Sequence, residues 1–275
     1  MVKSYLSRFL ASLSQSKQCR SRIFYPQLIV FLSFFAYGNS ALASECDPFE
    51  VALSTTPVPP QYVHSLKQTA KIRETLADAN PDVLLVGDSL IQKWPANDLK
   101  NQFKGISVYN AGVGSDRVQN VNWRLKDDVF TKVSPNFVVY LAGTNNLSSQ
   151  KSCAIIEGIR ITLVEIRTLW PNATVVILTI PPRGDELEEY ASIIEEVNYG
   201  IRTEMPDKKI IALDLHKAFL EACQATTFSK LLYLVGIGSR CELLSSDMLH
   251  FSPAGYALIA EKLTLYFGSG QNASN

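Results

Sequence analysis

The sequence predicts an α/β protein, a three-layer α/β/α sandwich around a five-stranded parallel sheet. Short apolar runs bounded by turn residues alternate with stretches of helical periodicity. Alternation at this pitch is typical of right-handed βαβ units. The clearest run, Val83–Val86, is continuously apolar and leads into Gly87-Asp88-Ser89. Such a run suits a strand that is buried on both faces of a parallel sheet.

The chain begins with a pattern typical of an export signal. Five basic residues and no acidic one precede an apolar stretch, Leu28–Tyr37, and the small residues Ala41-Leu42-Ala43. This is the order of charge, apolar core and Ala-x-Ala site found in signal peptides. The core is short for a membrane span. We therefore expect cleavage after Ala43, a secreted or periplasmic protein and no stable membrane span, with an uncleaved anchor as the alternative.

Four segments are expected, with boundaries at 1–43 (signal peptide), 44–80 (lead-in and helix), 81–267 (the α/β domain) and 268–275 (a polar tail). Without the signal, 21 Lys+Arg face 26 Asp+Glu, since the signal removes five of the 26 basic residues. Nucleic-acid binding needs concentrated positive charge, so we expect no nucleic-acid partner. The oligomeric state is not predicted.

The elements follow in order. Cys46–Pro60 is expected to lie over the surface, and the helix Gln61–Asn80 follows with an apolar face formed by Tyr62, Val63, Leu66 and Ala70. The expected strands are apolar runs: Val83–Val86, Ile106–Tyr109, Phe137–Ala142, Thr174–Ile180 and Ile210–Leu213. The expected later helices have apolar residues recurring at three and four: Asp116–Val129, Ile155–Leu169 (ended by Pro171), Glu186–Met205 and Pro253–Tyr266.

One segment, Leu215–Ser246, has no clear strand and is expected to be a long loop of functional importance. It holds two of the four cysteines that follow the signal. An even number of cysteines in an exported protein predicts disulfides, and four allow three pairings. We expect Cys223–Cys241, because these residues bracket one loop-like region, which leaves Cys46–Cys153.

Ser89 is the candidate nucleophile. Ligands of open α/β sheets bind beyond the carboxyl ends of the strands, and Ser89 follows such an end. An ordinary strand-ending turn is the alternative interpretation of Gly87-Asp88-Ser89.

A serine nucleophile needs a base and an acid that orients the base. The chain has three histidines, and His250 precedes the last helix with Asp247 three residues before it. On one turn Asp247 could accept from one imidazole nitrogen while the other faces Ser89. The alternative is a structural histidine beside a helix-capping Asp. His64 and His216 are less suitably placed, and with three histidines and no Cys-x-x-Cys we expect no metal and no cofactor.

Two loops could form an oxyanion hole. Asn110–Asp116 follows the second expected strand, and Gly143–Asn146 follows the third and includes Asn145. The first could instead be a tight turn with Asp116 as an N-cap, or a degenerate dinucleotide fingerprint, Gly112-x-Gly114. For Asn145 and Asn146 the alternative is turn chemistry.

Taken together, Gly87-Asp88-Ser89, the glycine loop, Gly143-x-Asn145 and Asp247-x-x-His250 resemble the blocks of the GDSL/SGNH hydrolase superfamily. The stretch Tyr109–Asn146, with Asn122-Trp-Arg-Leu125, is similar to the branch of the platelet-activating-factor acetylhydrolase catalytic subunits. Pro181-Pro-Arg-Gly184 fits as well. The resemblance implies a flavodoxin-like SGNH fold, Ser89 as nucleophile, His250 as base, Asp247 as orienting acid, and an oxyanion hole from Ser89, Ser115 and Asn145.

The chain departs from this family in two places. Ser115 stands where the family has its oxyanion glycine, so its N–H serves only if the serine φ is negative or tolerates the left-handed region; Gly114 is the fallback. The segment Leu215–Ser246 is longer than in those relatives. We expect it to wall the substrate pocket, with Leu231–Val235 facing an acyl chain or packing under the sheet edge.

The resemblance implies an exported serine esterase that hydrolyses short-chain or acetyl O-acyl esters of carbohydrate or lipid. An O-acyltransferase with the same triad is one alternative. A non-catalytic carbohydrate-binding domain is another. There is no Gly-x-Ser-x-Gly elbow, which argues against an ordinary α/β-hydrolase.

Overall fold

The computed structural model describes residues 46–205, 207–224 and 241–267. The expected signal peptide, the run Leu231–Val235 and the polar tail lie outside these ranges. None of the helices within them combines the length and apolarity needed to cross a bilayer.

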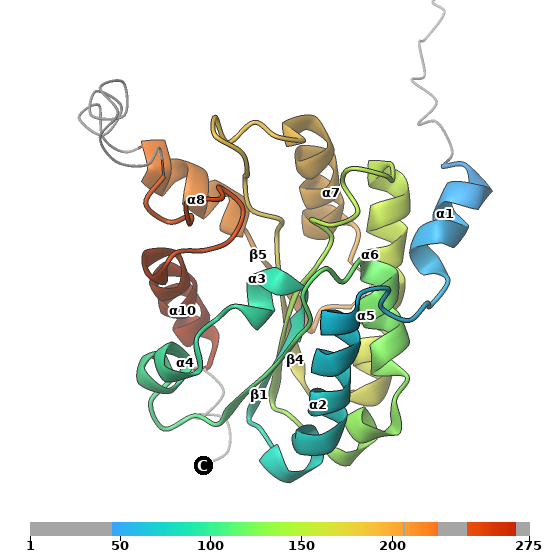
Figure 1. Cartoon of the computed structure of the whole chain (residues 1–275), viewed down its shortest axis with the longest axis vertical. Helices are drawn as coiled ribbons and strands as arrows, with labels where there is room; N and C mark the ends of the chain where they lie inside the picture. The colour runs from blue at the N-terminus through green and yellow to red at the C-terminus, as the bar shows by residue number, and fades with distance from the viewer. Residues whose placement is uncertain (1–45, 206, 225–240, 268–275) are drawn as a thin grey trace, which may run out of the picture. The chain divides into compact units, whose positions relative to one another are not determined.

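A five-stranded parallel sheet forms the centre of the fold, as predicted (Figure 1). Its strands lie in the order β2-β1-β3-β4-β5, so that β1 has β2 and β3 as neighbours. The strand bounds are β1 Val83–Gly87, β2 Val108–Gly112, β3 Phe137–Leu141, β4 Thr174–Leu178 and β5 Ile210–Leu213.

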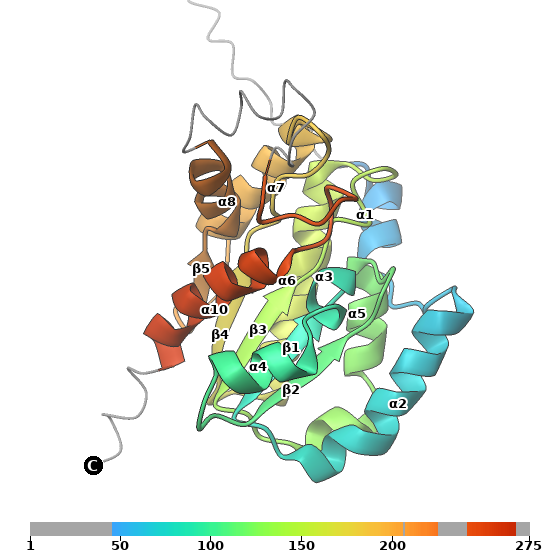
Figure 2. The same cartoon turned by 60° about the vertical axis from the view of Figure 1, so that its left-hand side comes forward.

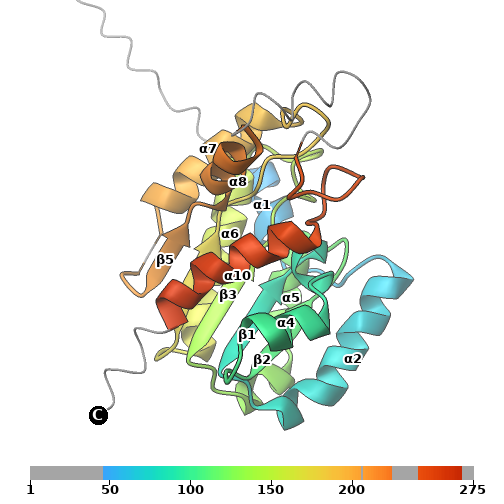
Figure 3. The ribbon, with the colours of Figure 1, turned by 90° about the vertical axis from the view of Figure 1, so that its left-hand side faces the viewer.

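Helices cover both faces of this sheet and complete the three layers (Figures 2 and 3). One face carries α2 (Val63–Ala79), α5 (Val118–Leu125), α6 (Ser152–Leu169) and α7 (Ala191–Thr203). The other carries α3 (Ser89–Gln92), α4 (Ala96–Gln102), α8 (Leu215–Gln224) and α10 (Pro253–Phe267). Figure 3 looks onto this second face, with α10 and α4 in front of the strands.

The apolar run of β1 serves both faces at once. Leu84 and Val86 belong to the core under α2 and α5, whereas Val83 and Leu85 belong to the core under α3 and α10. All four are fully buried, and burial of such a side chain contributes about 1.5–3 kcal/mol. Residue 87, which follows this run, is thereby fixed at the sheet's carboxyl edge.

The lead-in before the first expected helix is more regular than predicted. Residues Pro48–Thr55 form α1, whose N-cap Asp47 accepts a hydrogen bond from the Phe49 N–H at 2.9 Å. The helix packs against α5 and α6. Helices this short gain most of their stability from tertiary contacts, so sequence periodicity gave no sign of α1.

The buried face of α2 differs from the predicted one. Tyr62, Val63 and Leu66 are exposed, and Ala70 is exposed too. The buried positions are Ser65, Thr69, Ile72 and Leu76. Two of these four are polar, and Ser65 Oγ donates to the Gly114 carbonyl at 2.6 Å, so an apolar pattern could not reveal this face.

Several boundaries differ from expectation. Strand β2, expected at Ile106–Tyr109, lies at Val108–Gly112. The expected helix Asp116–Val129 divides into α5 and the 3₁₀ helix η1 (Asp128–Lys132), and the helix expected from Glu186 begins at Ala191. The long loop expected at Leu215–Ser246 begins with helix α8. Sequence spacing also missed the short helices α3 and α4.

Both disulfides have the expected pairing. Cys46 bonds to Cys153 with a Cα–Cα distance of 5.8 Å, and Cys223 bonds to Cys241 at 4.8 Å. The first fixes the segment before α1 to the start of α6. The second joins the end of α8 to the stretch that precedes α10.

Candidate active site

Ser89 lies at the carboxyl edge of the sheet, as the first residue of α3 directly after β1. Asp88 caps this helix, because its Oδ1 accepts from the Leu90 N–H at 2.9 Å. Gly87 is required by space, since a Cβ there would lie 2.0 Å from the Leu141 carbonyl oxygen. The close approach of β1 and β3 therefore fixes the backbone that carries the Ser89 hydroxyl.

The turn before α10 brings His250 to Ser89. His250 Nε2 lies 2.9 Å from Ser89 Oγ, and His250 Nδ1 lies 2.6 Å from Asp247 Oδ2. The turn is held by the Ser245 N–H, which donates to the His250 carbonyl at 2.7 Å. It is also held by the Gly184 N–H, which donates to the Met248 carbonyl at 2.8 Å. The sequence-predicted Ser, His and Asp thus form one hydrogen-bonded line.

The electrostatics of Asp247 define the histidine tautomer. Partial burial alone would raise the pKa of Asp247, but hydrogen bonds from the His250 backbone and ring and from the Leu249 N–H lower it to about 2. An ionised carboxylate only accepts hydrogen bonds, so His250 Nδ1 is the donor. In a neutral imidazole Nε2 is then the acceptor, and it faces the Ser89 hydroxyl.

The glycine loop after β2 lies beside Ser89, since β2 and β1 are neighbours. Ser115 has φ 65°, so the serine does adopt the left-handed region. The Gly114 N–H donates to Gln92 Oε1 at 2.6 Å, so the fallback donor is occupied. The N–H groups of Ser89 and Ser115 have no hydrogen-bond partner within the described ranges.

Asn145 joins this loop from β3. Its Nδ2 donates to the Asp116 carbonyl at 2.8 Å, and a side-chain amide has a second hydrogen available. Asn146 Oδ1 accepts from the Val118 N–H at 3.1 Å, which ties the same loop to α5. Gly143, with φ 124°, supplies a turn that L residues rarely adopt.

A buried ion pair ties the glycine loop to the ends of β1 and β2, and its pairing was not predicted. The alternative interpretation of the glycine loop made Asp116 an N-cap, but Arg117 is the N-cap of α5. Asp116 Oδ2 instead accepts from Arg124 Nε at 2.7 Å. Arg124 also donates to the carbonyls of Ala111 and Gly87, both at 3.1 Å. Burial raises the pKa of Asp116, and the adjacent guanidinium opposes that rise. Asp116 and Arg124 are eight residues apart, across a loop and the first turns of a helix. Their pairing could therefore not be predicted from sequence spacing.

The other two histidines make different contacts. His64 stacks on Tyr62 with ring centroids 5.5 Å apart, and its Nε2 lies 3.3 Å from Ser115 Oγ. His216 Nδ1 lies 3.1 Å from the Ile180 carbonyl, and burial lowers the pKa of this histidine. Of the three histidines, His250 is the one hydrogen-bonded to Ser89.

A serine hydroxyl, an imidazole and a carboxylate in line are the arrangement by which serine hydrolases attack acyl groups. A model of the GDSL-like lipase/acylhydrolase family matches residues 69–258. The chain belongs to this family and is a carboxylic ester hydrolase.

Curated relatives and solved structures agree with this assignment. Human platelet-activating factor acetylhydrolase IB subunit alpha2 is 27% identical over 188 residues, which are 68% of this chain and 76% of the relative. The rat alpha1 subunit is 32% identical over 126 residues, 46% of this chain and 54% of the relative.

Two solved structures share the fold. A GDSL-like lipase from Bacteroides thetaiotaomicron has a TM-score of 0.57 at 16% identity and covers 74% of this chain and 97% of its own. A member of the lipolytic G-D-S-L family from Veillonella parvula has a TM-score of 0.55 at 17% identity, with coverages of 68% and 97%.

Proposed function

We propose that this chain is an exported serine esterase that hydrolyses short acyl esters, acetyl esters of carbohydrate or lipid among them. Ser89, His250 and Asp247 are its triad. The observation that carries the proposal is the continuous hydrogen-bonded line from Ser89 Oγ through the imidazole to the Asp247 carboxylate. The curated relatives act, by their names, on platelet-activating factor as acetylhydrolases, which favours an acetyl or similarly short acyl group.

Acylation begins when His250 Nε2 accepts the Ser89 proton. The freed Oγ attacks the ester carbonyl carbon, and the carbonyl π electrons move to oxygen. Asp247 stabilises the imidazolium that forms. The imidazolium then gives its proton to the leaving alcohol oxygen as the carbon–oxygen bond breaks. A water, deprotonated by the same imidazole, releases the acid and restores Ser89.

The oxyanion is held by three donors from three neighbouring strand ends. These are the Ser89 N–H, the Ser115 N–H and the second amide hydrogen of Asn145. Preorganised donors of this kind typically contribute about 10²–10³ in rate each. Two observations support this assignment. The two backbone N–H groups have no hydrogen-bond partner in the described ranges, and Asn145 is held in place by its hydrogen bond to the Asp116 carbonyl.

Export is supported by the disulfides as well as by the signal-peptide pattern of the sequence. Disulfides persist in oxidising compartments and are rare where thiols are kept reduced, and the described ranges hold two. Expression of the full chain in a secreting host, followed by N-terminal sequencing, should give a mature end after Ala43. A mature protein that retains residues 1–43 would contradict cleavage.

The catalytic proposal is tested with 4-nitrophenyl acetate and a fluorophosphonate that labels activated serines. The wild type should turn over the ester and take up one label on the peptide that contains Ser89. Ser89→Ala should lose about 10³-fold or more in kcat and all labelling, because the nucleophile is absent. Ser134→Ala, at an exposed position before β3 at the opposite edge of the sheet, is the matched control.

Equal turnover by wild type and Ser89→Ala would contradict the assignment. Analysis of products with an added sugar acceptor separates hydrolysis from acyl transfer. Acetate alone supports the esterase, whereas an acetylated sugar would favour the acyltransferase alternative.

A further inference from the structure

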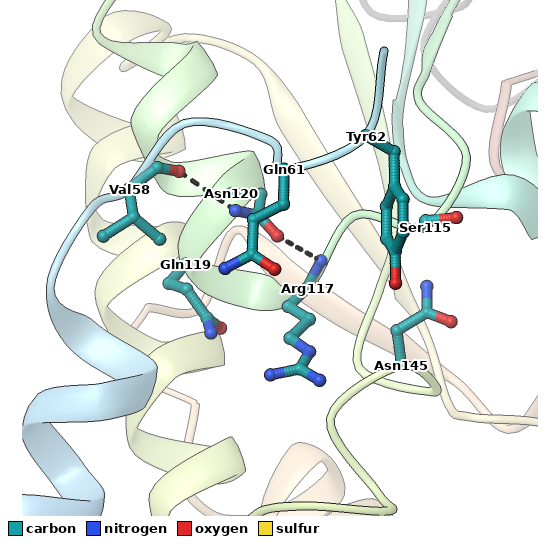
Figure 4. A pocket seen from close by; sticks show the side chains of 8 residues that line it. All are labelled: Val58, Gln61, Tyr62, Ser115, Arg117, Gln119, Asn120 and Asn145. Carbon is teal, nitrogen blue, oxygen red and sulfur yellow. Dashed lines mark hydrogen bonds between the residues drawn. The ribbon is translucent and has the colours of Figure 1, made fainter. Parts of the chain in front are cut away.

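A pocket lies beside the proposed oxyanion hole and shares two residues with it, Ser115 and Asn145 (Figure 4). Its volume is about 180 Å³. The residues that line it are Val58, Gln61, Tyr62, Ser115, Arg117, Gln119, Asn120 and Asn145. A group bound here would therefore lie next to the ester carbonyl.

One wall of this pocket comes from residues outside the family-matched range, which begins at residue 69. Figure 4 shows the side chains of Gln61 and Tyr62 reaching toward the pocket from one side, with Arg117 and Asn145 on the other. This wall belongs to the segment that precedes α2. The pocket therefore combines this wall with residues that lie inside the family-matched range.

Hydrogen bonds hold this wall against α5. Asn120 Nδ2 donates to the carbonyls of Val58 and Pro59 at 3.0 and 3.2 Å, and the Val58 N–H donates to the Gln119 carbonyl at 3.4 Å. Farther back, Ser54 Oγ donates to Gln150 Oε1 at 2.8 Å. The Cys46–Cys153 disulfide fixes the beginning of the segment. The wall is therefore fixed by contacts within the chain itself.

The charge of the lining points to the ligand. No acidic residue lines the pocket, and Arg117 is its cation. Within the described ranges the guanidinium of Arg117 has no carboxylate partner. Every other arginine there forms an ion pair with a carboxylate: Arg73, Arg124, Arg160, Arg167, Arg183 and Arg202. Arg117 is thus half-buried among amides and hydroxyls, without an ion-pair partner in the described ranges.

We propose that this pocket binds an anionic group, a carboxylate or a phosphate, carried by the ester substrate, and that Arg117 recognises it. The guanidinium fork matches the oxygens of either anion, and the neighbouring amides and the Tyr62 hydroxyl can contact the rest of the group. The preferred substrates are then acyl esters of acidic molecules or of diacids. This inference rests on the proposed esterase function and names its substrate class.

The test uses matched pairs of activated esters. 4-Nitrophenyl glutarate and its methyl ester place the charge, or its neutral match, on the acyl side. 4-Acetoxybenzoate and its methyl ester place it on the alcohol side, and 4-acetoxyphenyl phosphate replaces the carboxylate by phosphate. A charge-assisted hydrogen bond is typically worth about a ten- to hundredfold difference. The wild type should prefer at least one anionic ester by that ratio in kcat/KM, mainly through KM.

The variants assign the preference to Arg117. In Arg117→Gln the ratio of anionic to neutral kcat/KM should fall to about one, and Arg117→Lys should retain part of it. Arg73→Gln, in the exposed pair with Asp127, should keep the wild-type ratio. Thermal unfolding of each variant checks that the fold is intact.

The outcomes separate the two proposals. Absent turnover of all these esters, anionic and neutral, by the wild type would contradict the esterase itself. Turnover of the neutral esters without preference for any anionic one would overturn the anion pocket alone, and so would a preference that survives in Arg117→Gln. Preference on one side only, or for one anion only, identifies the position and nature of the charged group.

Discussion

Asp88, beside the proposed nucleophile, is a carboxyl without exposure to water. Its Oδ1 accepts from the Leu90 N–H, whereas Oδ2 has no hydrogen-bond partner in the described part of the chain. Burial, with the nearby Asp116 charge, raises the pKa of Asp88 from 3.8 to about 7, against the Leu90 hydrogen bond and the charges of Arg183 and Arg124. The folded protein therefore keeps a proton that the unfolded chain loses near pH 4.

This raised pKa predicts how stability varies with pH. Below pH 4 Asp88 is protonated in both states and adds nothing; between pH 4 and 7 only the unfolded state ionises, so the free energy of unfolding falls. The full loss above pH 7 is about 4 kcal/mol. The free energy of unfolding of Asp88→Asn, relative to that of the wild type, should therefore increase by that amount as the pH rises from 4 to 7. Urea unfolding at each pH measures the difference.

Asp78→Asn, at an exposed position of α2, is the control for this series. A difference between wild type and Asp88→Asn that stays constant from pH 4 to 7 would contradict the raised pKa.

Ser115 shows what residue identity alone leaves open. A left-handed conformation costs an L residue about 1–2 kcal/mol. From the sequence, the oxyanion donor could therefore be the N–H of Ser115 or that of Gly114. The structure has φ 65° at Ser115 and a Gly114 N–H that is bonded to Gln92. Such a choice depends on contacts between a loop and a side chain of α3, and these are not encoded in local pattern.

At the scale of elements, Arg124 connects α5 with the ends of β1 and β2. Arg124→Met should lower the free energy of unfolding by about 3–5 kcal/mol, because it leaves the Asp116 carboxylate buried without its partner. The carbonyls of Gly87 and Ala111 also lose their donor. Urea unfolding measures the loss.

Arg160→Met is the matched control for this change. Arg160 pairs with Glu157 on the partly exposed surface of α6, where such pairs contribute about 0–1 kcal/mol. Similar losses for the two variants would contradict a special role for the buried pair.

The strands and the order of the chemical blocks could be predicted because their signals are local. Four apolar residues in Val83–Val86 suffice for β1, and Asp247-x-x-His250 is a single turn. The face of α2 could not be predicted, because its buried Ser65 owes its place to the distant Gly114 carbonyl. The helices α1, α3 and α4 are too short for periodicity to show.

In the site, too, the features with local sequence signals were predicted and those that depend on distant contacts were not. Ser89, His250 and Asp247 were predicted from residue types and from the family resemblance, and the structure places them within hydrogen-bond distance. The anion pocket was missed because Gln61 and Tyr62 line it together with Arg117, which is distant in sequence and comes near them only in the folded chain. The sequence pattern placed Tyr62 on an apolar helix face, but the residue is 57% exposed.

At the scale of the whole molecule, the two disulfides close loops of very different length. The half-cystines of Cys46–Cys153 are 107 residues apart in sequence, and those of Cys223–Cys241 are 18 apart. A crosslink removes more entropy from the unfolded chain when it closes a longer loop. The first disulfide is therefore expected to contribute more to stability.

Replacing Cys46 and Cys153 together by Ser should cost about 1.5 kcal/mol more than replacing Cys223 and Cys241 together. Each loss should lie within about 2–5 kcal/mol, measured by urea unfolding of the oxidised proteins. Equal losses, or a larger loss for the shorter loop, would contradict the entropic account.

The contact between Ser89 and His250 joins positions 161 residues apart, from just after the first strand to just before the last helix. A fragment that ends before residue 250 lacks the imidazole and cannot make this contact. Ester turnover that returns during refolding would therefore report the moment when the turn holding His250 reaches the end of β1, whereas circular dichroism would report the formation of helices and strands.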